Sequence, residues 1–157
     1  MKILLPDLIT KQLTSALRQA GRQEIGGILM GEHVGEDTFR VKAITIQTHG
    51  GTFFTFRRVV QSFLAPLRRF FRETGYNYTK FNYLGEWHSH PSFSPEPSST
   101  DSETMWELVH DPEVGATFAV LLIVRLVNTN KLNGTVTIFL PNHQCLEGEL
   151  VQESNGL

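Results

Sequence analysis

Residues 86–101 limit the possible folds of this chain most, because strand, loop and helix signals follow one another within this one segment. Aromatic and apolar residues over 81–87 predict a β-strand that leads into the segment. Side chains at alternate positions of a strand point to the same face, so His88 and His90 project together. Pro91 ends the strand pairing, and the proline- and serine-rich loop that follows it opens a helix.

Asp101 lies in the first turn of that helix, three residues after Ser98, so the two side chains share one side of the turn. A loop of this length can fold Asp101 back onto His88 and His90. Two imidazoles and a carboxylate are ligands that a catalytic zinc ion uses, with a fourth position left for water. Cys145 is the one cysteine, which excludes a cysteine-rich structural site and an internal disulfide. We therefore predict that the two histidines and the aspartate bind Zn²⁺.

Hydrolysis assisted by zinc also needs a general base, and Glu24 is the best candidate for it. It directly precedes a glycine-rich apolar segment, residues 25–31, which predicts a strand that another backbone can approach closely. A carboxylate at the mouth of such a strand can reach a metal ion held on a neighbouring strand.

Each of these features alone has a simpler interpretation. The pair His88-x-His90 is typical of two half-buried strand residues, and Ser98-x-x-Asp101 is a common pattern at helix N-termini. A glutamate such as Glu24 before a strand is usually just exposed. Together, however, these residue types in their strand, loop and helix contexts favour a zinc hydrolase.

The pattern Glu24 … His88-x-His90-x7-Ser98-x2-Asp101 resembles the signature of the JAMM/MPN+ (JAB) metalloproteases. The Glu-x-Gly-Gly-x-Leu-x-Gly segment that begins at Glu24 and the proline after the second histidine are also similar to that family. The resemblance implies a JAB/MPN-like, cytidine-deaminase-like fold. It also implies that His88, His90 and Asp101 bind zinc, that Glu24 is the general acid/base, and that Ser98 helps to stabilise the oxyanion.

The usual activity of that family is hydrolysis of the bond after the C-terminal glycine of ubiquitin or a ubiquitin-like protein. The chain looks most like the stand-alone prokaryotic members, which implies deconjugation or processing of a bacterial ubiquitin-like protein. Its partners would be activating and conjugating enzymes of the same operon, including antiphage operons. An extended substrate tail could add to a sheet edge.

Three other functions stay open at this point. They are hydrolysis of sulfur-carrier-protein adducts, a non-catalytic MPN interaction module, and the DNA-repair-associated branch of the fold. The intact set of ligand residues argues against a pure scaffold. The net charge of −2 argues against a nucleic-acid partner.

The composition predicts a soluble globular protein, with 157 residues of which 40% are hydrophobic and 19% charged. We expect one domain over residues 1–157, with its core over about 5–151 and a polar tail over 152–157. No apolar run is long enough for a membrane span or a signal peptide, so we expect a cytoplasmic protein with no membrane partner.

Hydrophobic periodicity predicts an α/β fold in which helices flank a mixed central sheet on both sides. The continuous apolar run over 116–127 is typical of a central strand that is buried on both faces. Helices are expected over residues 6–20, about 57–74 and 99–110, and strands over 25–31, 39–47, 81–87, 116–127, 133–140 and 145–151.

Several segments allow two interpretations. Residues 48–56 combine paired glycines with aromatics and could be a flap over the active cleft or an ordinary turn with core phenylalanines. The arginines of 57–74 could dock an acidic partner or form a solvated face, and Pro66 should kink or divide that helix. Phe93 could contact substrate or pack its loop, and Cys145 is most simply a small core residue.

Overall fold

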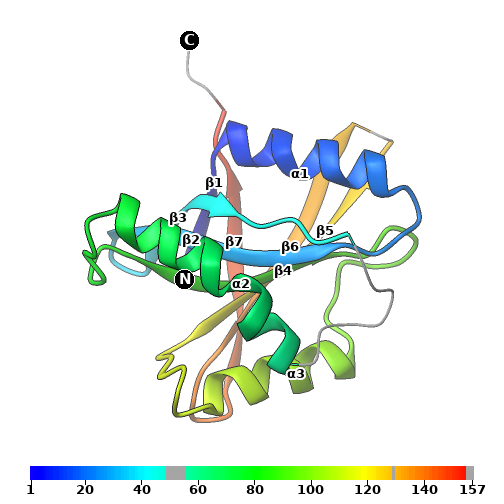
Figure 1. Cartoon of the computed structure of the whole chain (residues 1–157). Helices are drawn as coiled ribbons and strands as arrows, with labels where there is room; N and C mark the ends of the chain where they lie inside the picture. The colour runs from blue at the N-terminus through cyan, green and yellow to red at the C-terminus, as the bar shows by residue number, and fades with distance from the viewer. Residues whose placement is uncertain (49–55, 129, 155–157) are drawn as a thin grey trace.

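The computed structural model describes residues 1–48, 56–128 and 130–154, with the backbone only over 56–62. Most elements lie within two or three residues of their predicted bounds, as Figure 1 allows the reader to follow. In chain order they are β1 (Lys2–Leu5), α1 (Asp7–Ala20), β2 (Gly26–Gly35), β3 (Thr38–Ile44), α2 (Phe56–Glu73), β4 (Phe81–Ser89), α3 (Ser99–His110), β5 (Ala119–Val127), β6 (Lys131–Phe139) and β7 (Cys145–Gln152).

The described strands form a closed barrel in the order β1-β3-β2-β4-β5-β6-β7, which confirms the mixed α/β class but replaces the flanked central sheet expected from the sequence. Closure depends on β1, which pairs in parallel with β3 on one side and with β7 on the other. A strand of four residues is too short to show a reliable alternation, so periodicity did not predict it. Closure gives every named strand two neighbours, but β6 pairs with β7 only from Val136 onward, so the addition of a substrate tail to a sheet edge remains a prediction.

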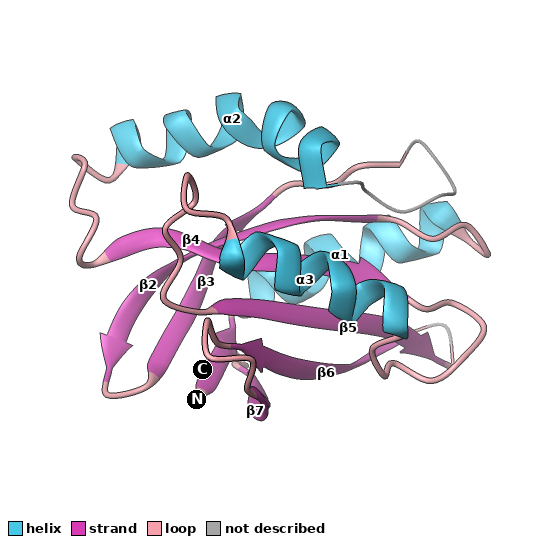
Figure 2. Ribbon diagram, turned by 90° about the horizontal axis from the view of Figure 1, so that it is seen from below, coloured by secondary structure: helices cyan, strands magenta, loops and turns pink. Residues whose placement is uncertain are grey.

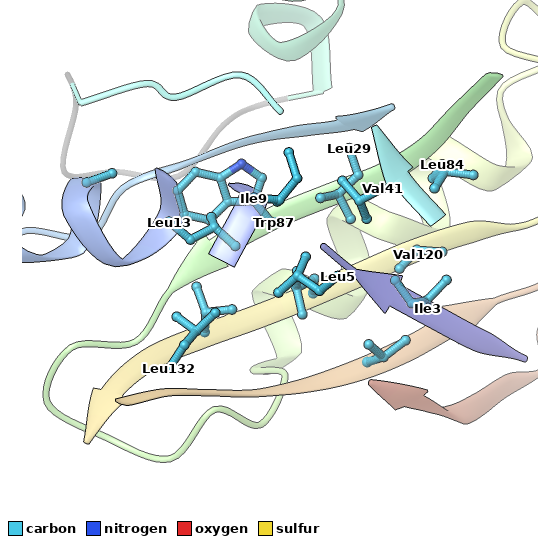
Figure 3. Packing of buried hydrophobic residues seen from close by; sticks show 14 of the residues in the cluster. Ile3, Leu5, Ile9, Leu13, Leu29, Val41, Leu84, Trp87, Val120 and Leu132 are labelled. Carbon is cyan, nitrogen blue, oxygen red and sulfur yellow. The ribbon is translucent and has the colours of Figure 1, made fainter. Parts of the chain in front are cut away.

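Helices α1 and α3 pack against opposite faces of the strands (Figure 1). Figure 2 gives a clear view of α2 and α3. The face toward α1 carries the larger core cluster, part of which is drawn in Figure 3. Strand β5 contributes to both sides: Val120, Leu122 and Val124 face α1, whereas Leu121 and Ile123 pack with α3. This confirms that β5 is buried on both faces.

An irregularity in β4 decides which of its side chains face α2 and α3. Leu29 pairs with Gly85 and the next residue, Met30, with Tyr83, so Leu84 is an extra residue in the ladder. Gly85 has φ of +149°, a conformation that L side chains rarely adopt. Beyond this bulge the side chains of β4 alternate regularly between its two faces. The bulge therefore sets the face on which the functional side chains of β4 lie.

Four expectations about single segments need correction or comment. Cys145 is exposed because it follows a surface turn at the start of β7, so it is not a core residue. Helix α2 runs through Pro66 without being divided. Glu153, in the expected polar tail, accepts three hydrogen bonds from the Arg40 side chain. Of residues 48–56, the stretch 49–55 lies outside the described residues, so the flap remains a prediction.

The described arginines of α2, which are Arg68, Arg69 and Arg72, are exposed. None of the described helices combines the length and the apolar composition that a membrane span requires.

We expect Gly85→Ala to lower the free energy of unfolding by about 3 kcal/mol or more. A Cβ at this position would lie 1.9 Å from the Val120 carbonyl oxygen, on a backbone with positive φ. Gly35→Ala is the matched control, because its nearest neighbour would be the Thr38 Cβ at 3.9 Å. Urea unfolding followed by circular dichroism measures both variants, and equal effects would contradict this account of the bulge.

Candidate metal centre

His88 lies at the carboxyl end of β4, where it pairs with Gly26 of β2 and with Ile123 of β5. A Cβ at Gly26 would lie 2.6 Å from the Trp87 carbonyl oxygen and 3.1 Å from the His88 Cβ. Only glycine therefore lets β2 run this close to His88. Trp87 points to the opposite face, into the core beside α1, and its indole nitrogen donates to the Thr45 carbonyl at 2.9 Å.

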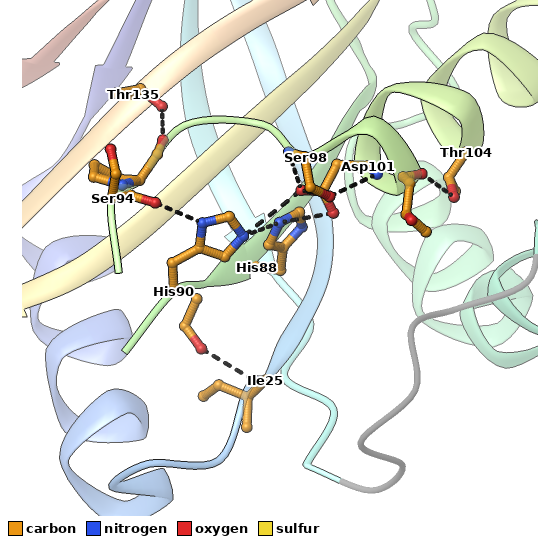
Figure 4. A network of polar contacts seen from close by, with 11 residues as sticks. Ile25, His88, His90, Ser94, Ser98, Asp101, Thr104 and Thr135 are labelled. Carbon is orange, nitrogen blue, oxygen red and sulfur yellow. Dashed lines mark hydrogen bonds and ion pairs between the residues drawn. The ribbon is translucent and has the colours of Figure 1, made fainter. Parts of the chain in front are cut away.

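His88, His90 and Asp101 come together in one buried cluster, as the sequence predicted (Figure 4). Their side chains are buried, with 5%, 3% and 7% of their surfaces exposed, and their potential ligand atoms lie within 4.8 Å of one another. The two Nε2 atoms of the histidines are 3.1 Å apart. Asp101 Oδ1 lies 3.3 Å from His88 Nε2, and Asp101 Oδ2 lies 3.6 Å from His90 Nε2.

Asp101 is held by the N-terminus of α3, and Ser98 is the cap of that helix. The Ser98 backbone N–H and hydroxyl both donate to Asp101 Oδ2 at 2.7 Å, and the Ser98 oxygen accepts from the Asp101 N–H at 3.2 Å. Burial raises the pKa of Asp101, but the contacts with His88 and Ser98 outweigh burial and hold the pKa well below its usual range. The carboxylate is thus charged and fixed in orientation, as a metal ligand must be.

The orientation of His90 is fixed by the loop after it. Its Nδ1 lies 2.8 Å from the Ser94 carbonyl oxygen, which can only accept, so Nδ1 carries the proton and Nε2 turns a lone pair toward the cluster. The neighbouring carbonyls accept as well: Pro95 from the Thr135 hydroxyl, and Phe93 from an Arg125 Nη1 at 3.4 Å. The loop is therefore bonded to β5 through Phe93, to β6 through Pro95 and to His90 through Ser94.

Glu24 immediately precedes Ile25, which is bonded to the residue between the two histidines. Ser89 bonds twice to Ile25, through its own N–H to the Ile25 carbonyl at 2.9 Å and through its hydroxyl from the Ile25 N–H at 3.0 Å. These bonds tie the residue before β2 to the end of β4. Glu24 is half-buried and lies outside the paired strands, so its approach to the cluster remains a prediction.

Two residues near the cluster were not predicted from the sequence. Glu86, two positions before His88, is buried, its Oε1 has no hydrogen-bond partner among the described residues, and burial raises its pKa to about 7. The second is Arg125 of β5, whose bond to the Phe93 carbonyl is given above. A sequence signal was present in each case, because Glu86 is the one acidic residue of its strand and Arg125 the one charged residue of an otherwise apolar strand.

The donor set fits a metal ion. With metal–nitrogen distances of about 2.0–2.1 Å, the ligands of a tetrahedral site lie roughly 3.3–3.4 Å apart. The three separations in this structure are 3.1, 3.3 and 3.6 Å, with a different Asp101 oxygen facing each histidine, and they are close to that value. Two histidine nitrogens and one carboxylate would leave the fourth position open. His88, His90 and Asp101 could therefore hold a metal ion.

The chain belongs to the prokaryotic JAB family, whose model, described as prokaryotic homologs of the JAB domain, matches residues 6–136. It is 32% identical over 128 residues to a protein of Enterobacter hormaechei subsp. hoffmannii (strain UCI 50) named CD-NTase/cGAS isopeptidase. That alignment covers 78% of this chain and 66% of the relative, so the chain spans just under two thirds of the relative's length. The resemblance seen in the sequence motifs is thus confirmed at the level of the family.

Two solved structures share the fold. Protein DSY2949 from Desulfitobacterium hafniense has a TM-score of 0.69 over 98% of this chain and 94% of its own. A protein from Salinibacter ruber (strain DSM 13855) has a TM-score of 0.60 over 98% of this chain and 92% of its own. Both are 20% identical to this chain, so they support the fold and carry no argument about activity.

We expect Ser89→Ala to lower the free energy of unfolding by about 1–3 kcal/mol, because it leaves the buried Ile25 N–H without its hydroxyl acceptor. Ser92→Ala, in the exposed part of the next loop, is the control and should change stability by less than about 0.5 kcal/mol. Urea unfolding of both variants makes the comparison. If the two values agree, the Ser89 bond does not anchor the start of β2.

Proposed function

We propose that this chain is a cytoplasmic, zinc-dependent isopeptidase that hydrolyses the bond after the C-terminal glycine of a ubiquitin-like protein. The reaction would release that protein from a conjugate or process its precursor. The observation that carries the proposal is the buried cluster of His88, His90 and Asp101. Membership of the JAB family and the likeness to a protein named as an isopeptidase support the type of bond. Activating and conjugating enzymes of the same operon are the proposed partners.

Zinc is the metal that we propose for this cluster. His88 and His90 would bind it through Nε2, and Asp101 would bind it through its carboxylate. A set of nitrogen and oxygen donors with one open position is typical of catalytic zinc. When bound, zinc would polarise the scissile carbonyl and lower the pKa of a bound water to about 7.

Glu24 is proposed as the general acid/base. It would accept a proton from the attacking water and pass it to the leaving amine as the C–N bond breaks. The products are a carboxylate on the ubiquitin-like protein and a free amine. The half-buried position of Glu24 leaves its carboxylate accessible to both the water and the amine.

Ser98 is proposed to donate a hydrogen bond to the developing oxyanion. Its hydroxyl donates to Asp101 in this structure, and the residue as a whole is exposed at the start of α3. Rotation about one bond would turn the hydroxyl hydrogen from Asp101 toward the substrate. The Ser98 backbone N–H would continue to hold Asp101 in place.

We expect Glu24→Gln to lower kcat by about 10²–10⁴ while one zinc ion per chain is retained, because Glu24 moves protons and is not a ligand. His88→Ala should lose both zinc and activity. The assay is release of a reporter fused after the C-terminal glycine of a ubiquitin-like protein, with metal content measured by mass spectrometry. His143→Ala, at an exposed position of the β6–β7 turn, is the control. Loss of zinc from Glu24→Gln would show that the assigned role is wrong.

For Ser98→Ala we expect kcat to fall by about 10² or more, which is typical of removing one oxyanion donor, with zinc content unchanged. Ser99→Ala, the exposed neighbouring position, should keep full activity. The same reporter assay and metal analysis apply. If zinc content falls together with kcat, Ser98 acts by holding Asp101 and not by contacting the substrate.

A further inference from the structure

Arg125 of β5 lies beside His90. Ser89 pairs with Val124 in the parallel ladder between β4 and β5, and the His90 N–H donates to the Val124 carbonyl at 3.0 Å. In a parallel pair this bond makes Arg125 the direct neighbour of His90. The segment with Glu24 leads into β2, and Arg125 lies on β5, so the proposed base and this cation lie on opposite sides of β4; Glu24, His90 and Arg125 are called the row below.

The guanidinium of Arg125 has spare donors. Its Nη1 donates to the Phe93 carbonyl at 3.4 Å, which is long for a hydrogen bond, and its Nε is buried without a partner among the described residues. No ion pair to Arg125 is present in the described part of the chain. The ring of Phe93 packs on His90 with the centroids 4.2 Å apart, and 48% of its surface is exposed.

A cation in this place is electrostatically unfavourable unless an anion binds there. A metal ion in the cluster of His88, His90 and Asp101 would repel the guanidinium, and a buried N–H without an acceptor reduces stability. A ligand with carboxylate or carbonyl oxygens would remove both penalties. The planar guanidinium matches such oxygens in bidentate geometry, which a lysine cannot do.

We propose that Arg125 binds the acyl side of the substrate, where its guanidinium donates to the C-terminal residue of the ubiquitin-like protein. This inference rests on the proposed function. Glu24 protonates the leaving amine at one end of the row, so the amine lies toward β2 and the acyl group toward β5. When water has added and the C–N bond has broken, the acyl group is a carboxylate, and Arg125 pairs with it. The exposed ring of Phe93 packs against the same segment of substrate.

A merely structural role for Arg125 is the competing explanation, because its bond to the Phe93 carbonyl helps to hold the loop that orients His90. The two explanations differ in what they imply for ligand charge. A substrate contact makes binding sensitive to a terminal carboxylate, whereas a loop contact changes metal content or affects all ligands equally.

The test compares two probes on the zinc-loaded full chain: acetylglycylglycine, which ends in a carboxylate, and acetylglycylglycinamide, which does not. Their dissociation constants are measured by chemical-shift titration. We expect Arg125→Gln to reduce the preference for the carboxylate about tenfold or more, with zinc content and amide affinity unchanged. Arg125→Lys should recover only part of the preference, because lysine keeps the positive charge but lacks the planar guanidinium that donates two parallel hydrogen bonds. Arg72→Gln, which removes a charge from an exposed position of α2, should keep the wild-type preference.

The proposal is overturned if the wild type shows no preference for the carboxylate or if Arg125→Gln keeps it. It is equally overturned if Arg125→Gln loses zinc or weakens both probes to the same degree, which would establish the loop role. Failure of the proposed function would give a different result. The wild type would then not cleave the reporter, but its binding of the carboxylate probe would still depend on Arg125.

Discussion

The close pairing of β2 with β4 at Gly26 and His88 is the contact on which the rest of the site depends. It requires glycine on one strand, because a Cβ there would meet both the backbone and the side chain of β4. Next to this ladder, Ser89 bonds twice to Ile25, the residue that follows Glu24. Asp101 then completes the cluster from the start of α3, where Ser98 holds it with three hydrogen bonds.

The parts of the structure that could be predicted are those whose sequence signals lie within a few residues of one another. His88, His90 and Asp101 were found because strand alternation, a proline and a helix cap are local features. Closure of the barrel was missed because it depends on a four-residue strand that joins β3 to β7. Arg125 was missed because its place beside His90 is set by the register between two strands, which lie 35 residues apart in the chain (125 − 90) and which periodicity cannot align.

The arrangement separates opposite charges across the cluster. Glu24 leads into β2 and Arg125 lies on β5, while the Ser94 carbonyl accepts from the ring of His90. A peptide bond held across such a row would have its amine near a proton donor and its acyl group near a cation.

Zinc K-edge absorption spectroscopy of the purified wild-type chain, combined with its zinc stoichiometry, tests the central claim most directly. The account requires one zinc ion per chain, with two imidazole nitrogens and further oxygen ligands at about 2.0–2.2 Å and no sulfur. Absence of zinc from protein prepared without chelators would contradict it. So would scattering from a sulfur ligand, since Cys145 is exposed and is not one of the three residues of the cluster.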